Sequence, residues 1–441
     1  MKKLLSLVLA LALVVSAFTL TGCGSKDSSK SDSDLKVGCI MVGDDQETYT
    51  KAHIDGIIEA AKEVGIPESN LIWKYAVKED DSCAKAAKEL IGNGCSLIIA
   101  NSYGHQDYIA KVAKENPKVN FVSMTGDFAA ISGLDNMYNA FTNIYEARFV
   151  SGVVAGMKIK ELADAKKIPE KSINKDGKVK VGYVGAYPYA EVVSGYTAFF
   201  LGIQSVYKDV AMDVSYTNSW FDPKKEAAAA DKFIKDNCVV IGQHADSTGA
   251  PSTIQKAKDK GSLVYSVGYN MDMLPVAKTA ALTSPLNNWK VCYKDILQAA
   301  ADGKDIPQDW AKGYADDAVS ISKLGPEAAK GTDAKVEEVI KGIKDGSLKV
   351  FDTKSFTITG DSVKATKDPT KGSIVDLKLD KDGVVTKATK DFSYMDFTAN
   401  PPKVVYKGEV KDTIKDGEFS ESTLRSAPYF SLRIDGITEL N

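Results

Sequence analysis

A set of aromatic and polar side chains falls at the ends of predicted strands or in the first turns of predicted helices. The aromatic members are Tyr49, Tyr103, Trp220 and Phe221, and the polar members are Asn101, His244, Asp246, Asn270 and Asp272. Aromatic planes suit the faces of a flat heterocycle, where stacking contributes about 1–3 kcal/mol per ring. Carboxylates and amides can recognise donors and acceptors on its edge. Taken singly, each aromatic is better explained by packing; their shared position makes a ligand site an equally good explanation.

The sequence carries no familiar catalytic template. It contains no GxSxG, HExxH, P-loop or EF-hand motif, and only three histidines, His53, His105 and His244. The segment QHADS pairs His244 with Asp246, but no nucleophile accompanies them by motif. No CxxC occurs and no cysteine lies near a histidine at ligand spacing, so zinc is not expected. We therefore predict a binding protein that is not an enzyme and has no cofactor or metal.

The N-terminus has the composition of a secretory signal. Met-Lys-Lys precedes the apolar run LLSLVLALALVVSAF, and LTGC follows, ending at Cys23. LTGC resembles the bacterial lipobox, after which the mature chain begins with a diacylglyceryl cysteine. We expect residues 1–22 to be a lipoprotein signal peptide and residues 23–35 to be the lipidated Cys23 and a polar tether. Two acyl chains anchor a protein stably, which predicts a cell-membrane location on the extracytoplasmic face. An ordinary signal peptide with a chance cysteine is the alternative.

The remaining composition is that of a globular protein. Of 441 residues, 44% are hydrophobic and 26% charged, and the net charge is −3. This balance lacks the basic footprint of a nucleic-acid-binding protein, so we expect no nucleic-acid partner. We also expect a monomer, and the aromatic and polar set above predicts a small-molecule ligand. Five cysteines remain besides Cys23, so at least one cannot pair within the chain. Isolated, buried thiols are favoured, although a disulfide cannot be placed from sequence.

From Lys36 onward, short apolar runs alternate with segments of helical periodicity. Examples are the strand-like KVGCIMVG, SLIIANS and KVKVGYVGA, and the helical AHIDGIIEAAKEVG and EARFVSGVVAGMKIKEL. Near-continuous apolar strands separated by helices indicate parallel sheets covered on both faces. The pattern predicts an α/β protein with two doubly wound lobes. In such sheets ligands bind outside the carboxyl ends of the strands, where the site residues fall.

The expected domains follow from this alternation and its end. Lobe 1 comprises residues 36–146 and 271–330, and lobe 2 comprises residues 147–270. From about residue 345 the chain alternates at period two with GD and DG turns, which favours antiparallel strands. We therefore expect residues 331–441 to form a β-rich C-terminal extension that docks on a lobe.

Six segments resemble, in order, the basic membrane protein (BMP) family of ABC-transporter substrate-binding lipoproteins, which includes purine nucleoside receptors. They are NSYGHQDYIAKVAKENPKVNF, NMYNAFTNIYEARFVSGVVAG, SWFDPKKEAAAADKFI, VVIGQHADST, SVGYNMDM and LTSPLNNW, and the similarity spans residues 36–302. The resemblance implies a periplasmic-binding-protein type I fold with a ligand cleft between two lobes. It also implies delivery of a purine nucleoside or purine base to an ABC permease. QHADS is similar to the QHTDS-type branch of the family.

The resemblance also implies roles for particular residues. Tyr49 and Trp220 match the aromatics that stack a nucleoside base. Asn270 stands where nucleoside-binding members have an aspartate that holds the ribose, and their lysine has no counterpart near residues 287–289. The ribose contacts are therefore altered, so a free base or a modified nucleoside is an option. We expect edge hydrogen bonds from Asn101, Asp246 and Asn270, and support from His244 and Asp272.

Two other functions are compatible with the same sequence. A ligand sensor would have this fold but dock on a membrane receptor instead of a permease. A cell-surface nucleoside hydrolase would need a base and a positioned water, which the few histidines and the missing motifs argue against.

Overall fold

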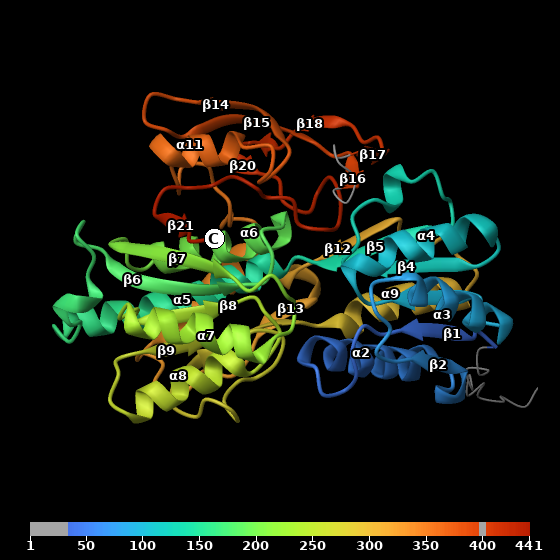
Figure 1. Ribbon diagram of the computed structural model, residues 1–441, viewed down its shortest axis with the longest axis horizontal. Helices are drawn as coiled ribbons and strands as arrows, with labels where there is room; N and C mark the ends of the chain where they lie inside the picture. Colours follow the sequence, from blue (N-terminus) through green and yellow to red (C-terminus); the bar gives the residue numbers. More distant parts are fainter. Residues whose placement is uncertain (1–33, 397–402) are drawn as a thin grey trace, which may run out of the picture.

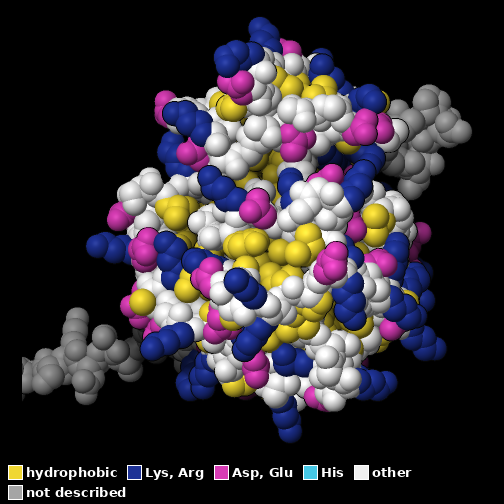
Figure 2. Space-filling model, turned by 90° about the vertical axis from the view of Figure 1, so that its left-hand side faces the viewer, with side chains coloured by type: hydrophobic (Ala, Val, Ile, Leu, Met, Phe, Trp, Pro, Cys, Tyr) yellow, Lys and Arg dark blue, Asp and Glu magenta, His cyan; other side chains and the backbone are white. Residues whose placement is uncertain are grey.

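The computed structural model describes residues 34–396 and 403–441, so the predicted signal peptide and Cys23 lie outside the described residues. Two α/β lobes lie side by side, and the C-terminal extension lies across one edge of both (Figure 1). The prediction of two doubly wound α/β lobes is therefore confirmed. Lysines, arginines and acidic side chains are interspersed over the face shown in Figure 2, as the near-balanced composition suggests.

Lobe 1 is built on a parallel sheet with the strand order β12-β5-β4-β3-β1-β2. Its strands are β1 (Val37–Ile40), β2 (Leu71–Lys74), β3 (Leu97–Ala100), β4 (Asn120–Met124), β5 (Met137–Thr142) and β12 (Asp309–Lys312). Its helices are α2 (Thr48–Val64), α3 (Asp81–Gly92), α4 (Gln106–Glu115) and α9 (Trp289–Ala301). Helix α2 packs against α9, and α3 against α4. Strands β1 and β3 are buried throughout, as a sheet with two covered faces requires.

Lobe 2 repeats this plan with the order β10-β9-β8-β6-β7-β21, again parallel throughout. Its strands are β6 (Val179–Gly185), β7 (Val210–Tyr216), β8 (Val240–Gln243), β9 (Tyr265–Val267), β10 (Ala281–Thr283) and β21 (Ile437–Glu439). Its helices are α5 (Ile144–Asp164), α6 (Ala190–Gln204), α7 (Pro223–Lys235) and α8 (Gly249–Asp259). Helix α7 begins where the sequence specifies it: the Asp222 carboxylate accepts hydrogen bonds from the amides of Lys224 and Lys225, and Pro223 occupies the first turn.

The chain crosses between the lobes at three places, after β5, before α9 and after β12. The second and third crossings pair with each other as an antiparallel ribbon of β11 (Pro285–Asn287) and β13 (Val319–Ile321). The expectation that residues 281–283 belong to lobe 1 is wrong, because β10 pairs with β9 and extends the lobe 2 sheet. This short apolar strand carries no signal of which sheet it joins.

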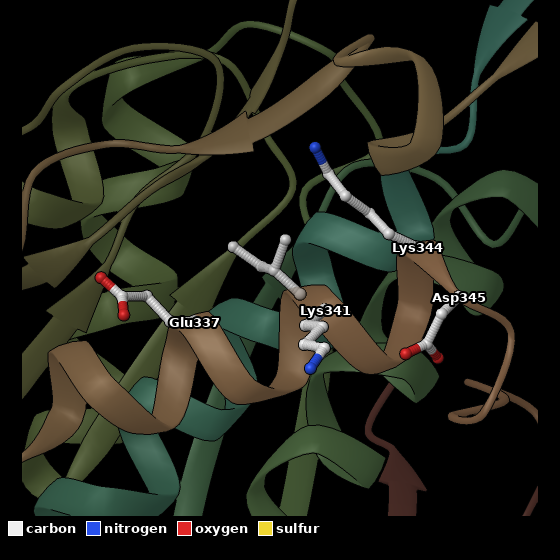
Figure 3. A pocket seen from close by; sticks show the side chains of 5 residues that line it. Glu337, Lys341, Lys344 and Asp345 are labelled. Carbon is white, nitrogen blue, oxygen red and sulfur yellow. The ribbon is translucent and has the colours of Figure 1, made fainter.

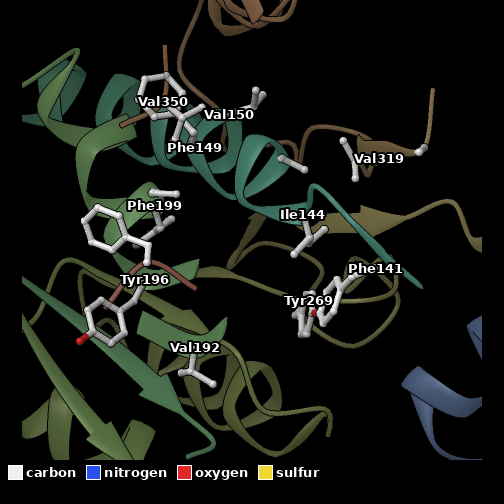
Figure 4. Packing of buried hydrophobic residues seen from close by; sticks show 14 of the residues in the cluster. Phe141, Ile144, Phe149, Val150, Val192, Tyr196, Phe199, Tyr269, Val319 and Val350 are labelled. Atoms are coloured by element: carbon white, nitrogen blue, oxygen red, sulfur yellow. The ribbon is translucent and has the colours of Figure 1, made fainter. Parts of the chain in front are cut away.

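Helices α5 and α6 cross at very close range in the core of lobe 2 (Figure 4). A Cβ atom on Gly152 would lie 2.0 Å from the carbonyl oxygen of Phe199, and one on Gly202 would lie 2.1 Å from that of Phe149. Only glycine allows this approach. Around the crossing, Phe149, Val150, Val192, Tyr196 and Phe199 belong to one buried hydrophobic cluster that continues to Phe141 and Tyr269.

The C-terminal extension, residues 331–441, begins with two helices, α10 (Thr332–Lys344) and α11 (Gly360–Lys367). Small antiparallel sheets follow: β14 (Ile374–Leu379), β15 (Val385–Asp391) and β18 (Val410–Asp412); β16 (Tyr394–Asp396) and β17 (Lys403–Tyr406); β19 (Ile414–Lys415) and β20 (Glu418–Phe419). The chain ends with β21, which adds in parallel to β7 at the edge of lobe 2.

The cysteines of the described chain are buried and free: Cys39, Cys83, Cys95, Cys238 and Cys292. Burial raises the pKa of the Cys83 and Cys238 thiols to about 12, so both are protonated at neutral pH and unreactive. They fill the core as small hydrophobic side chains.

Candidate functional site

The carboxyl ends of strands from both lobes meet where the first turn of α2 reaches the loop after β8. The Thr48 hydroxyl, in lobe 1, donates a 2.6 Å hydrogen bond to the backbone carbonyl of Asp246, in lobe 2. Nearby, the rings of Tyr103 and Tyr189 approach to 5.8 Å between centroids, again one from each lobe. These two contacts bring Asp246 and Tyr103, both predicted site residues, to the junction of the lobes, where the strand-end argument expects a site.

Tyr49 is held tightly on the lobe 1 side. Its hydroxyl donates a 2.5 Å hydrogen bond to the Asn101 carbonyl, and its ring meets the edge of His53 at 4.4 Å. Burial, above all, raises the pKa of Tyr49 well above its usual value, so the hydroxyl stays protonated. The Asn101 side chain accepts from the Val42 amide at 2.8 Å and donates to Thr50 at 3.3 Å. Its amide therefore braces the loop after β1.

Trp220 lies in an aromatic cluster, which we define as Tyr103, Tyr187, Tyr189 and Trp220. Tyr187 and Tyr189 stack with centroids 5.0 Å apart and planes 9° apart. The Trp220 ring meets them at 5.1 Å and 6.1 Å. Sequence reasoning included Tyr103 and Trp220 but missed the other two, although their segment AYPYAE directly follows β6. The cluster offers several aromatic faces at the interlobe site.

The other predicted aromatic, Phe221, is placed differently. Its side chain is 44% exposed, and its backbone carbonyl accepts from the Ser219 hydroxyl at 3.1 Å. The loop geometry thus turns Trp220 toward Tyr187 and leaves Phe221 toward solvent.

A chain of polar side chains runs from the lobe 2 site to the crossing segments. Asn270 donates to the Asp246 carboxylate at 2.6 Å, and Asn287 donates to the Asn270 carbonyl oxygen at 2.9 Å. The Thr142 hydroxyl then donates to Asn287 at 2.5 Å. Asn270 has a left-handed backbone with φ of 61°, which asparagine tolerates better than most residues. Asn287 and Thr142 were not predicted as site residues.

Asp246 supplies the carboxyl group of this hydrogen-bonded series of side chains, and only 5% of the residue is exposed. Burial raises its pKa well above the usual value, and the negative charges of Glu47, Glu226 and Glu191 act in the same direction. A carboxyl group with a raised pKa can exchange between acceptor and donor roles. Asp246 can therefore adapt to either a donor or an acceptor on a ligand.

His244 is braced from behind the site. Its Nε2 lies 2.6 Å from the Glu191 carboxylate, and its ring centroid is 5.1 Å from that of Tyr269. Burial and the Arg148 cation lower the pKa of His244, although Glu191 opposes them. The Arg148 guanidinium stacks 3.6 Å over the Tyr269 ring. The geometry gives His244 contacts that hold Tyr269 and α6 in place.

Asp272 has a local role in the structure. Its Oδ1 atom accepts from the Leu274 amide at 2.9 Å, which is an Asx turn. The turn lies two residues beyond Asn270 and fixes the course of the chain after the left-handed position.

A buried carboxyl at the lobe junction was missed by sequence reasoning. Glu146, in the first turn of α5, accepts from the Tyr314 amide at 2.7 Å and thereby ties the first crossing to the third. Burial raises the pKa of Glu146 to about 7. The only sequence signal was its place in the EAR segment that starts the helix.

Other parts of the described chain offer little for ligand chemistry. A hollow on α10, lined by Glu337, Ile340, Lys341, Lys344 and Asp345, is open to solvent (Figure 3). Within residues 34–396 and 403–441, no cluster of histidine, cysteine and acidic side chains could hold a metal ion. No helix in that same part of the chain is long and apolar enough to cross a membrane.

Comparison with known proteins decides the family. Residues 35–354 match the family model Bmp, described as ABC transporter substrate-binding protein PnrA-like. The chain belongs to this family. The match covers both lobes and the start of the extension, and it confirms the family predicted from the six sequence segments. Membership makes the protein an ABC-transporter substrate-binding protein, with a small-molecule ligand and a permease as its partner.

Curated relatives of this Bmp-family chain carry several ligand names. A purine-binding protein of Brucella abortus is 34% identical over 76% of this chain and 87% of its own length. A putative glucose-binding protein of Haloferax volcanii is 28% identical over 64% and 66%. A nucleoside-binding protein, BmpA, of Lactococcus lactis is 24% identical over 69% and 86%.

Solved structures agree on the fold. An ABC-transporter solute-binding protein from Aeropyrum pernix superposes with a TM-score of 0.57, at 16% identity, over 75% of this chain and 96% of its own. The two-lobed architecture is therefore shared with solute-binding proteins of distant sequence.

Proposed function

We propose that this Bmp-family protein captures a purine base or purine nucleoside between its lobes and delivers it to an ABC importer. The observation that carries the proposal is the aromatic cluster, contributed by both lobes, on the same interlobe site as the Asp246–Asn270 pair. Aromatic faces stack on a heterocycle, while the carboxyl recognises its edge. Of the two Asp246 oxygens, Asn270 binds only Oδ1, so the other is available to a ligand.

The hydrogen-bonded series Asp246–Asn270–Asn287 favours a free base over an unmodified nucleoside as the ligand. Asn270 already donates one amide hydrogen to Asp246 and accepts one hydrogen bond from Asn287, which uses half of its hydrogen-bonding capacity within the protein. A neutral amide is a poorer partner for ribose hydroxyls than a carboxylate, whose hydrogen bonds are stronger. The names of the relatives from B. abortus and L. lactis support the purine class. The name of the H. volcanii relative makes glucose the rival ligand.

Replacing Trp220 by alanine is expected to weaken purine binding at least tenfold, because one stacking face is lost, equivalent to about 1.4 kcal/mol. Isothermal titration calorimetry against adenine, guanine, hypoxanthine, their ribosides and glucose measures this. Trp73→Ala is the matched control, since Trp73 lies on β2 and stacks on Tyr75; its affinity should equal that of the wild type. Unchanged affinity in folded Trp220→Ala removes Trp220 from the site, and binding of glucose alone refutes the purine proposal.

We further propose that the protein binds without catalysis and that lobe closure signals the loaded state to the permease. Hinge closure is the common motion of two-lobed binding proteins. No catalytic motif accompanies His244 and Asp246 in the sequence. Incubation with inosine or adenosine should return the nucleoside intact by chromatography, whereas release of free base would identify a hydrolase. A sensor role would require binding to a receptor domain in place of the permease.

The proposed membrane anchor is the lipid on Cys23. Labelling cells with an alkyne fatty acid should mark the wild-type protein, and Cys23→Ala should lose the label completely, because the acylated thiol is gone. Cys39→Ala is the control: Cys39 is buried in β1, so the label should persist. Lipid label retained on Cys23→Ala would show that the LTGC match is a chance one.

A further inference from the structure

The C-terminal extension is fastened to lobe 2 by its last strand. Strand β21 pairs in parallel with β7 through Ile437, Thr438 and Glu439. The Asn441 side chain donates to the Tyr216 carbonyl and accepts from the Tyr216 amide, both at 2.8 Å. The extension therefore continues the lobe 2 sheet and must move with that lobe.

The same extension also contacts lobe 1. Tyr394 and Tyr406, on β16 and β17, pack on the Phe128 ring at 4.6 Å and 4.7 Å between centroids. The Tyr394 hydroxyl donates to the Asp107 carboxylate, on α4, at 2.5 Å. Figure 1 shows the extension running from above β7 to beside β5 and α4. A single segment thus bridges the two lobes, in addition to the three crossings and the direct contacts Thr48–Asp246 and Tyr103–Tyr189.

A third contact on lobe 1 lies in the chain before β21. The amide and hydroxyl of Ser426 donate to the Asp309 carboxylate, on β12, at 3.0 Å and 2.8 Å. Next to Ser426, the Arg425 guanidinium lies 3.2 Å from Oδ2 of Asp127. Both side chains of this ion pair are largely buried, with 14% and 13% exposed. Partly buried ion pairs are stronger than exposed ones, because solvent screens them less.

Asp127 connects this ion pair to the aromatic cluster. Its Oδ2 atom, which faces Arg425, also accepts from the Tyr103 hydroxyl at 3.4 Å. Gln106 holds Asp127 on the other side, donating to its Oδ1 at 3.2 Å and accepting from its amide at 2.9 Å. Arg425 itself is placed by the rings of Phe392 and Tyr429, within the extension, at 5.6 Å and 6.0 Å. A shift of Arg425 would therefore move or release Asp127 and so alter the position of the Tyr103 ring.

We propose that the C-terminal extension is a strap that ties lobe 2 to lobe 1 at the rim of the interlobe site, with Arg425 as the positioning residue that acts through Asp127 on Tyr103. Opening of the lobes must break the contacts of the extension with lobe 1, the Arg425–Asp127 ion pair among them, or detach the extension from β7. The strap therefore restricts the open form and couples the extension to ligand affinity. The affinity part rests on the proposed purine function; the restriction of opening does not.

Double electron–electron resonance would report the interlobe distance. The spin labels would be placed on Lys85→Cys, in α3, and Lys224→Cys, in α7. Both lysines are exposed, the five native cysteines of the described chain are buried, and the lipid proposed on Cys23 blocks the sixth thiol, which makes labelling selective. In the ligand-free full chain, Arg425→Gln should give longer and broader distances than the wild type. Lys381→Gln is the control, because Lys381 lies in the same extension, is 87% exposed and pairs only locally with Asp382.

The same variants would be titrated with the purine that binds the wild type most tightly. Arg425→Gln should lower its affinity about fivefold or more, the usual size of coupling between sites. Asp127→Asn added to Arg425→Gln should widen the distances little further, because both changes break one contact. Wild-type distances in folded Arg425→Gln would overturn the strap. If no purine binds the wild type, the purine proposal fails, while the distances still decide the strap.

Discussion

Replacing Glu439 by alanine should lower the free energy of unfolding by about 3–5 kcal/mol, the usual cost of removing one partner of a buried ion pair. Glu439 is the carboxylate around which the extension joins lobe 2. It accepts from the hydroxyls of Tyr196 at 3.0 Å and Tyr216 at 2.7 Å, and from Lys371 at 2.6 Å. Arg433 donates to it at 3.2 Å, and both charged side chains are under 10% exposed. Alanine would leave the Arg433 cation buried without its partner.

The pH dependence of this contribution follows from the pKa. Burial alone would raise the pKa of Glu439, but Arg433, Lys371 and the Tyr216 hydroxyl outweigh burial and lower it to about 2. The folded-state pKa is thus below the unfolded value of about 4.3. The stabilisation is fully present above the unfolded value and is lost as the pH falls toward 2. The difference between wild type and Glu439→Ala should therefore shrink on acidification below pH 4.

Urea denaturation at pH 7 and at lower pH, followed by tryptophan fluorescence, measures both effects. Glu409→Ala is the matched control in the same extension. Glu409 pairs with Lys411 at 2.7 Å but is 75% exposed, and exposed pairs contribute at most about 1 kcal/mol. Equal losses in the two variants would show that the Glu439 contacts do not stabilise the junction.

The sheet architecture was predictable because parallel strands leave a strong local signal. Residues Leu97–Ala100, for example, are apolar at every position, as a strand in a sheet covered on both faces requires. The place of β21 was not predictable in the same way. It is three residues long and pairs with Met212–Val214, more than 200 residues earlier. The amino-acid types in the two segments do not indicate that they pair with each other.

The candidate site shows the same division. The rule that ligands bind at strand ends brought Asp246 and Asn270 into one set, and the structure joins them at 2.6 Å. The rule could not give the other partners of a side chain. Asn287 joins the polar chain from a crossing segment, and Tyr187 enters the aromatic cluster from a loop whose path depends on tertiary packing. The predicted sandwich of Tyr49 and Trp220 stays a prediction, since their ring neighbours here are His53 on one side and Tyr187 and Tyr189 on the other.

The extension adds a constraint on the opening and closing of the two lobes in this protein. Two-lobed binding proteins open and close about their crossings, here the β11–β13 ribbon and the residues after β5. Contacts of the extension with both lobes add a constraint outside these crossings. Ligand affinity then depends on residues that never touch the ligand, because the free energy of opening enters the apparent dissociation constant.

Gly152→Ala is expected to destabilise the protein by about 3 kcal/mol or more, because the added methyl group meets backbone that cannot rotate away. The new Cβ would lie 2.0 Å from the Phe199 carbonyl oxygen, so α5 and α6 would have to separate by about an ångström. Helix α5 carries Arg148, which stacks on Tyr269, and α6 carries Glu191, which holds His244. Separation of the helices should therefore weaken ligand binding as well as stability.

The matched control is Gly92→Ala, at the end of α3, where an added Cβ has no neighbour within 4 Å. There alanine should be neutral or stabilise by up to about 1 kcal/mol, since glycine loses more backbone entropy on folding. Opposite signs in a thermal or urea denaturation series would show that the helix crossing, rather than glycine chemistry in general, governs Gly152. Equal effects at the two positions would mean that α5 and α6 can shift apart freely. Lobe 2 would then hold the site residues less rigidly than its close packing indicates.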